Sequence, residues 1–239
     1  MKKFKSLVSL IITACIFFSM FSLPSFAAED SFPVSEAVIV VSDNRTITEN
    51  YAAERLQYYL SEILGKSIEI KSDNDTFSYE ICVGNTSRSN TYDNSEADGS
   101  YKISSDKNRI IINGAGNKGA INGVYAFLEK YCGCHWYESE VIIIPGNATL
   151  TIPTDADVSY TPFFEYSETD TRSSGDAEFS VANGLTGGIY KDLTDEQGCA
   201  VEYIGSSSHT LVNYFCKPEK YFSEHPSWTL NRACNAVWQ

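Results

Sequence analysis

The stretch that most constrains the fold is IIINGAGNKGAINGVYAFLEKYCGCHWY, residues 110–137. It predicts a strand at 110–112, a turn through 113–116 and then a helix. Gly119 and Gly123 lie four apart in this helix, where each glycine costs about 1 kcal/mol relative to alanine. We therefore expect the helix to pack closely on a sheet. The apolar side chains that recur at helical spacing predict one broad buried face; they are Ala120, Ile121, Val124, Tyr125, Phe127, Leu128 and Tyr131.

The glycine-rich turn allows two interpretations. Gly114, Gly116 and Gly119 match the G-x-G-x-x-G spacing, with Lys118 inside it, and such a turn before a helix can bind a phosphate. A dinucleotide site also needs an early βαβ unit with an acidic residue at the end of its second strand. A Cys-Gly-Cys turn and an aromatic cluster follow instead, which favours tight helix-on-sheet packing over phosphate binding.

The pattern strand, G-x-x-x-G-x-x-x-G-V-Y-x-F-L-E, then Gly-Cys-x-Trp-Tyr resembles the N-terminal domain of bacterial α-glucuronidases. The same α/β domain precedes the barrel of β-N-acetylhexosaminidases and of other secreted polysaccharide-degrading proteins. Further matching pieces are AERLQYYL at 53–60 before Gly65, ICVG at 81–84 and Ile-Pro at 144–145. The resemblance covers about residues 36–230. It implies an α/β domain followed by the start of a (β/α)₈ barrel.

The order of elements predicts a two-layer α/β domain over residues 28–152. A helix over 52–64 follows Thr48, which begins a capping pattern, and ends at Gly65. Alternation of strands with two helices favours one sheet with both helices on the same face. The expected strands are 38–41, 68–70, 79–83, 101–105, 109–112, 141–144 and 150–152.

Residues 153–162, PTDADVSYTP, are predicted to be a linker because turn formers lie between two prolines. Residues 163–239 would then be the incomplete start of the barrel, with its first strand at 163–166 and a short helix at 176–183. A (β/α)₈ barrel takes about 250 residues, so we expect no closed barrel in this chain.

Two residues are candidate substrate-binding groups through the resemblance. The resembled families often carry a sugar-contacting arginine just after the first barrel strand. Here Ser167 stands nearest that position and Arg172 lies five residues further on. His209 ends a small-residue loop, GSSSHT at 205–210, before a P-x-x-Y-F-x-x-H-P pattern. It either donates to a sugar hydroxyl or carboxylate, or bonds to the backbone of its own loop.

The first 27 residues are typical of a secretory signal peptide, with Lys2, Lys3 and Lys5, an apolar run at 7–18 and Ser-Phe-Ala before the cleavage point. Cleavage would remove three of the 18 basic residues and none of the 31 acidic ones. The strongly acidic remainder argues against nucleic acid or an anionic membrane as partner. We expect a secreted protein that binds an oligosaccharide or polysaccharide, with no membrane contact after cleavage. Any uronate would need a local basic pocket.

Six cysteines would remain after cleavage, and export permits disulfides whose pairing the sequence does not reveal. Cys132-x-Cys134 lacks metal-site spacing, and no second ligand pair follows. We therefore predict neither a metal site nor a cofactor.

Glycoside hydrolysis usually requires two carboxylates that flank the scissile bond. The close pairs Glu138/Glu140, Glu165/Glu168 and Glu219/Glu224 are more typical of solvated surfaces, and in the resembled enzymes the catalytic acids lie further along the barrel. We predict no catalytic residue in this chain. The favoured function is a carbohydrate-active protein of α-glucuronidase-like type, inactive by itself; the alternative is a non-catalytic carbohydrate-binding or cell-surface interaction module.

Overall fold

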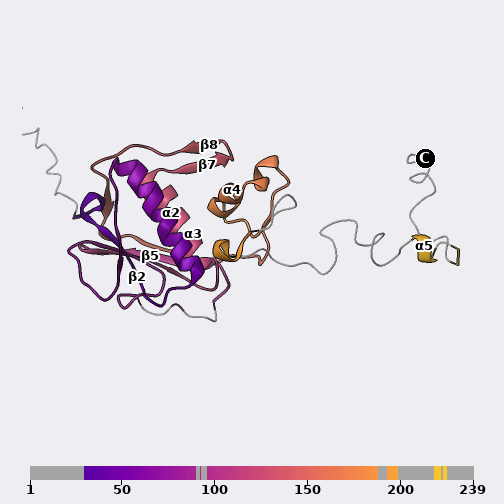
Figure 1. Cartoon of the computed structure of the whole chain (residues 1–239), viewed down its shortest axis with the longest axis horizontal. Coiled ribbons are helices and arrows are strands. Elements are labelled where there is room, and N and C mark those ends of the chain that lie inside the picture. Colours follow the sequence, from indigo (N-terminus) through magenta and orange to yellow (C-terminus); the bar gives the residue numbers. More distant parts are fainter. Residues whose placement is uncertain are drawn as a thin grey trace, which may run out of the picture.

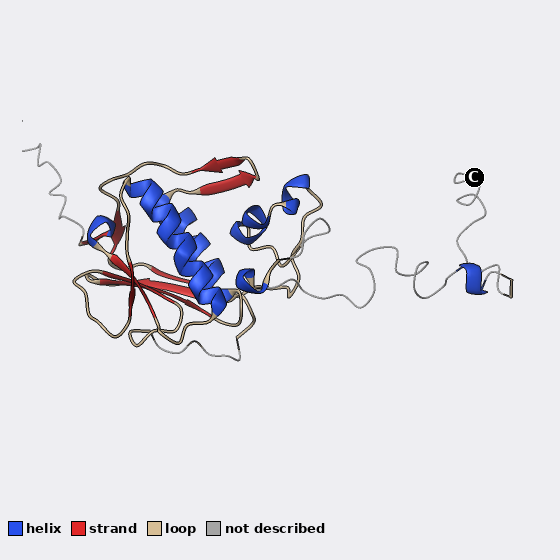
Figure 2. Ribbon diagram, in the orientation of Figure 1, coloured by secondary structure: helices blue, strands red, loops and turns tan. Residues whose placement is uncertain are grey.

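The computed structural model describes residues 30–89, 92, 96–187, 193–198, 218–221 and 223–224. The expected signal peptide and His209 lie outside these residues. A twisted sheet forms one layer, two long helices cover one of its faces, and a two-stranded hairpin lies on the other side of the helices (Figures 1 and 2). The mixed α/β class expected from the sequence is confirmed.

The main sheet has six strands in the order β10-β5-β6-β4-β2-β3. Strands β3, β2, β4 and β6 run parallel, β5 is antiparallel to β6, and β10 is antiparallel to β5. The parallel strands are short, and the two central ones, β2 and β4, are mostly buried. The bounds are Val38–Val41 for β2, Ile70–Ser72 for β3, Glu80–Val83 for β4, Tyr101–Ser105 for β5, Arg109–Gly114 for β6 and Asp157–Tyr160 for β10.

The two long helices are α2, Ile47–Leu64, and α3, Gly119–Cys132. The N-cap of α2 is Thr46, two residues before the expected capping residue Thr48, because Thr46 and Glu49 form a complete capping box. Its end at Gly65 is confirmed: Gly65 has a φ of 65°, a left-handed conformation that favours glycine.

The core lies between the sheet and these helices, and the predicted close packing of α3 is confirmed. A Cβ on Gly123 would lie 2.8 Å from Ile112 Cγ2 and 3.3 Å from Tyr101 Cβ. The glycines therefore let the helix approach β5 and β6 closely. The largest fully buried side chains of this core are Phe32, Ile39, Leu56, Tyr59, Leu60, Ile63, Ile81, Ile103, Ile110, Ile112, Tyr125 and Phe127.

A hairpin of β7, His135–Glu138, and β8, Val141–Ile143, covers the helices on the side away from the sheet (Figure 1). Trp136 points inward, where its ring lies 5.1 Å from both Tyr59 and Tyr125, centroid to centroid. Beside the main sheet, β1, Ser31–Pro33, pairs with β9, Thr151–Pro153, and the one-turn helix η1, Val34–Glu36, follows β1.

The prediction of a linker at 153–162 is wrong, because β9 includes Pro153 and β10 forms an edge strand of the main sheet. In β10, Val158 pairs with Ile103 and packs against the core, while Tyr160 stacks on Tyr101 with centroids 5.4 Å apart. This strand is only four residues long and has turn formers on both sides, which masks its alternation in the sequence.

The strand expected at 163–166 is not formed, and Phe163 and Phe164 are 90% and 71% exposed. We call residues 163–187 and 193–198 the arm, and residues 30–160 the body. The short helix expected at 176–183 is confirmed as α4. The arm contains η2, Arg172–Gly175, α4, Ala177–Ala182, and η3, Asp195–Gln197; a further short helix, α5, spans Pro218–Tyr221.

The far face of the sheet carries a buried ion cluster. Glu80, fully buried on β4, accepts hydrogen bonds from Arg88 at 3.1 and 3.2 Å, from Arg109 at 2.9 Å and from the Phe77 N–H at 3.1 Å. Burial raises the pKa of Glu80, but these hydrogen bonds outweigh burial and lower the net pKa. Arg88 also donates to the carbonyls of Asp73 and Asp75 and so fixes the loop between β3 and β4.

Among the described residues, no helix is long and apolar enough to cross a bilayer.

Candidate functional site

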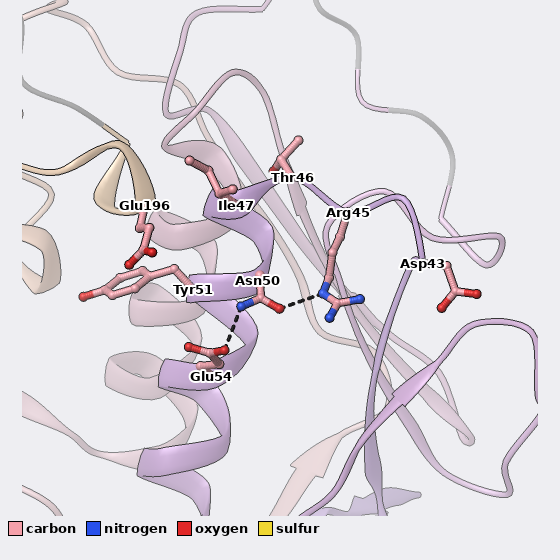
Figure 3. A pocket seen from close by; sticks show the side chains of 8 residues that line it. All are labelled: Asp43, Arg45, Thr46, Ile47, Asn50, Tyr51, Glu54 and Glu196. Carbon is pink, nitrogen blue, oxygen red and sulfur yellow. Dashed lines mark hydrogen bonds between the residues drawn. The ribbon is translucent and has the colours of Figure 1, made fainter.

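A pocket with a volume of about 410 Å³ opens beside the N-terminal half of α2 (Figure 3). Most of its lining comes from α2 and the turn before it, and Glu196 on η3 of the arm closes one end. The lining is mainly polar, with Tyr51 as its aromatic member. The residues are Asp43, Arg45, Thr46, Ile47, Asn50, Tyr51, Glu54 and Glu196.

The start of α2 determines which side chains face the pocket. The Thr46 hydroxyl accepts from the Glu49 N–H at 3.1 Å, and the Glu49 carboxylate accepts from the Thr46 N–H at 2.8 Å. This capping box fixes the register of the first turn. Residues 47, 50, 51 and 54 then share one face of the helix, because side chains three and four apart align.

Hydrogen bonds hold the pocket's polar side chains in a row. Arg45 Nε donates to Asn50 Oδ1 at 2.7 Å, and Asn50 Nδ2 donates to Glu54 Oε1 at 2.7 Å (Figure 3). Within the described part of the chain, Glu54 Oε2 and the Glu196 carboxylate have no hydrogen-bond partner. Their oxygens can therefore accept hydrogen bonds from a ligand's hydroxyl or amine groups.

The charge of the pocket favours some ligands over others. Carboxylates of Asp43, Glu54 and Glu196 stand against the single guanidinium of Arg45. A carboxylate or phosphate ligand would meet net repulsion, whereas a neutral polyhydroxyl ligand would find acceptors and donors. This is not the basic pocket that a uronate requires.

A cluster of polar side chains around Glu178, which we call the Glu178 cluster, holds the arm beside this pocket. Glu178 Oε1, on α4, accepts from Tyr59 OH at 2.6 Å, from Tyr125 OH at 2.6 Å and from Arg55 at 2.8 Å. Its Oε2 lies 3.4 Å from the hydroxyl of Tyr51, whose side chain lines the pocket. The Glu178 cluster therefore joins α2, α3 and α4 at one carboxylate.

Burial, reinforced by the Glu178 charge, raises the pKa of both Tyr59 and Tyr125. The same two causes raise the pKa of Tyr51. All three phenols stay protonated at neutral pH and remain hydrogen-bond donors. Trp136 Nε1 donates to Tyr59 OH at 2.8 Å, so the cluster extends to the hairpin.

The glycine-rich turn holds a carboxylate of the protein itself. Asp98 Oδ1 accepts from the Lys118 N–H at 2.9 Å, at the N-terminal end of α3, and lies 2.2 Å from the place of a Cβ on Gly116. A Cβ on Gly114 would lie 2.4 Å from the backbone of Gly119. Close backbone packing therefore accounts for these glycines, as the favoured interpretation expected.

The N-terminus of α2 is filled in the same way. Glu49, which is buried, accepts from the Asn85 N–H at 2.7 Å in addition to its capping bond to Thr46. Both helix ends at the carboxyl edge of the sheet, where anions often bind, thus hold side-chain carboxylates from within the domain.

Of the two residues predicted as substrate-binding, Arg172 lies within the described residues and His209 lies outside them. Arg172 begins η2 on the surface, and within the described residues it has no hydrogen bond or ion pair. It does not line the pocket. The role of His209 stays a prediction.

Sequence reasoning missed the pocket. Its signal was the polar face Asn50, Tyr51 and Glu54 after the capping box, a pattern that also describes an ordinary solvent-facing helix. Glu178 gave no local signal, because its partners lie 53 to 127 residues away in sequence.

Among the described residues no group of three or more potential metal ligands occurs. Cys82, Cys132 and Cys134 are buried free thiols. Burial raises the pKa of Cys82 to about 12 and that of Cys134 to about 11.

No family model matches the chain, and no curated protein matches it. The solved structures to which it is similar include three glycoside hydrolases. A GH20 β-N-acetylhexosaminidase from Streptomyces coelicolor is 13% identical with a TM-score of 0.41, covering 58% of this chain and 25% of the enzyme.

The second is a GH115 4-O-methyl-α-glucuronidase with specificity for decorated arabinogalactans. It is 14% identical with a TM-score of 0.40, over 55% of this chain and 18% of the enzyme. The third is a GH138 enzyme that targets pectin rhamnogalacturonan II. It is 17% identical with a TM-score of 0.37, over 56% of this chain and 13% of the enzyme. The chain thus spans a quarter or less of each enzyme, and at these identities the function must be inferred from the site itself.

Proposed function

We propose that this chain belongs to a secreted carbohydrate-active protein, and that its α/β body binds a neutral saccharide in the pocket beside α2 without hydrolysing it. The observation that carries the proposal is the hydrogen-bonded row Arg45–Asn50–Glu54 beside the ring of Tyr51. A row held in this way presents donors and acceptors to hydroxyl groups without first losing side-chain freedom. Secretion through residues 1–27 and the α-glucuronidase-like type are part of the proposal and rest on the sequence.

The excess of carboxylates in the pocket indicates which class of sugar it binds. Three carboxylates would repel the carboxylate of a glucuronic acid residue, so the bound sugar is neutral. Hydrolysis of uronic acid linkages would require a site other than this pocket.

Titration calorimetry of residues 28–239 tests this proposal. A neutral xylo-oligosaccharide and the same oligosaccharide carrying glucuronic acid serve as the two ligands. The neutral ligand should bind and the acidic one should bind several-fold more weakly. Tighter binding of the acidic ligand would contradict the charge argument, and no binding of either would reject the saccharide site.

Asn50→Ala is the informative variant, because Asn50 joins Arg45 to Glu54. Loss of one hydrogen bond to a neutral ligand costs about 1 kcal/mol, or about fivefold in Kd. Asn44→Ala is the matched control, since Asn44 is exposed next to the pocket but does not line it. Equal weakening by both variants would show that the pocket is not the binding site.

A second candidate function, a cell-surface interaction module, is favoured by a different observation. Val141, Ile142 and Ile143 on β8 are 47%, 39% and 45% exposed, and Tyr137 on β7 is 59% exposed. Val141→Lys would leave saccharide binding unchanged but weaken association with a protein partner. A Val141→Lys variant that still binds the oligosaccharide but no longer associates with the partner would support the interaction function, and unchanged association would reject it.

A further inference from the structure

Helix α4 depends on its surroundings for its conformation. It has six residues, from Ala177 to Ala182, and a helix this short is not stable alone in water. Its N-cap, Asp176, accepts from the Phe179 N–H at 2.8 Å, which satisfies one end. The remaining stabilisation has to come from contacts with the body.

Glu178 supplies the most concentrated of these contacts. One oxygen receives two phenol hydroxyls and one guanidinium nitrogen, all within 2.8 Å. The side chains of Glu178 and Arg55 are 22% and 25% exposed, so solvent screens this pair only partly. Hydrogen bonds to a charged group are stronger than neutral ones, and here they reach two helices of the body.

A second attachment follows along the arm towards η3. Lys118 Nζ, from the turn before α3, donates to the Thr186 carbonyl at 3.2 Å. A Cβ on Gly198 would lie 2.7 Å from Lys118 Cγ. Lys118 therefore contacts the arm at Thr186, before η3, and at Gly198, directly after it, and η3 itself packs against α2.

The arm contributes one residue to the lining of the pocket, Glu196 on η3. Tyr51 connects the two features, since its side chain lines the pocket and its hydroxyl lies near Glu178 Oε2. Loss of the Glu178 carboxylate would leave α4 held by its apolar residues Ala177 and Val181 alone on this side. The looser attachment would change both Tyr51 and the wall that carries Glu196.

We infer that Glu178 is a positioning residue for the pocket: its carboxylate holds the arm against α2 and α3 and so fixes Glu196 and Tyr51 where a ligand binds. This inference rests on the proposed function for its ligand, but not for its geometry. Glu178 touches no ligand itself. Its effect on binding passes through the arm.

Hydrogen exchange measured by mass spectrometry tests the geometric part without any ligand. In Glu178→Ala, peptides covering 177–182 and 195–198 should exchange at least about tenfold faster, the effect of losing one charged hydrogen-bond cluster. Glu178→Gln keeps an acceptor oxygen and should show a smaller increase. Peptides covering β2, β4 and β6 should be unchanged in both variants.

The matched control is Glu62→Gln, because Glu62 is an exposed carboxylate on α2. It should leave exchange in the arm as in the parent chain. Unchanged exchange of 195–198 in Glu178→Ala would overturn the inference. Equal acceleration across arm and body would also overturn it, because Glu178 would then support the whole fold rather than the arm.

A binding measurement separates this inference from the proposed function. If the parent chain binds a neutral oligosaccharide, Glu178→Ala should raise Kd at least fivefold and Glu178→Gln less, a graded loss. Unaltered Kd in a variant with a loosened arm would overturn the positioning role. If the parent does not bind, the proposed function fails, while the exchange result still decides whether Glu178 fixes η3.

Discussion

The body and the arm are held together by different forces. The body has a continuous apolar core between its sheet and helices, with the buried Glu80 paired to two partly exposed arginines on the far face. The arm has short helices and exposed aromatic residues. It adds Ala177, Val181 and Leu193 to the edge of that core and is attached to the body by the polar contacts of Glu178 and Lys118. Substitutions in the body should therefore act on global unfolding, and substitutions in the arm on local order.

The difference also explains where the pocket lies. Helix α2 of the body, together with the turn before it, supplies seven of its eight lining residues, and the arm supplies Glu196. Regions of low local stability commonly carry binding and gating roles. A site at this boundary can be altered by changing the arm alone.

Glu80→Ala should have the largest effect and should destabilise the body by about 3 kcal/mol, because two arginines would lose their buried partner. Chemical denaturation measures the loss. Glu69→Ala is the control: Glu69 pairs with Lys71 on the surface, where an ion pair contributes about 0–1 kcal/mol. Similar losses from both variants would contradict the account of the far face.

The second largest effect should come from alkaline pH, which should destabilise the body. Thiols have a pKa near 9 when unfolded, whereas Cys134 and Cys82 titrate in the folded state at about 11 and about 12. Their contribution is complete below pH 9 and is lost as pH rises to 11–12. The free energy of unfolding should fall by more than about 1 kcal/mol between pH 9 and 10.5. Cys82→Ala/Cys134→Ala should flatten this slope, and an unchanged slope would contradict the assignment.

Gly123→Leu should destabilise the body by about 1–3 kcal/mol, since overpacking would force α3 away from Ile112. Gly146→Ala is the control, because a Cβ at Gly146 has nothing within 4 Å. The denaturation midpoints of both variants should be compared with that of the parent. A midpoint unchanged in Gly123→Leu would show that the packing face of α3 is assigned wrongly.

Asp176→Ala should weaken the arm locally by about 1 kcal/mol, the usual contribution of an N-cap side chain. Exchange in 177–182 should rise while the denaturation midpoint of the body stays within error. A lowered midpoint would mean that arm and body unfold as one unit.

Arg172→Ala should have the smallest effect, within about 0.5 kcal/mol on stability, because Arg172 is exposed. The prediction that it contacts sugar is tested separately by calorimetry. A change in affinity with no change in stability would support that role, and unchanged affinity would reject it.

The sequence predicted the body better than the arm for a physical reason. Strand and helix periodicity are local, so Ile110–Ile112 and the apolar face of α3 could be recognised directly. The strand β10 was missed because four residues between turn formers carry too little alternation. Glu178 is an ordinary acidic residue until folding brings Arg55, Tyr59 and Tyr125 around it.

The most direct test of the central claim is hydrogen exchange of residues 28–239 with and without a neutral oligosaccharide. Because the pocket joins α2 to η3, peptides covering 43–54 and 195–198 should be protected together, while peptides covering β4 and the β7–β8 hairpin stay unchanged. Protection confined to the hairpin, or no protection at saturating ligand, would contradict the claim that body and arm form one saccharide site.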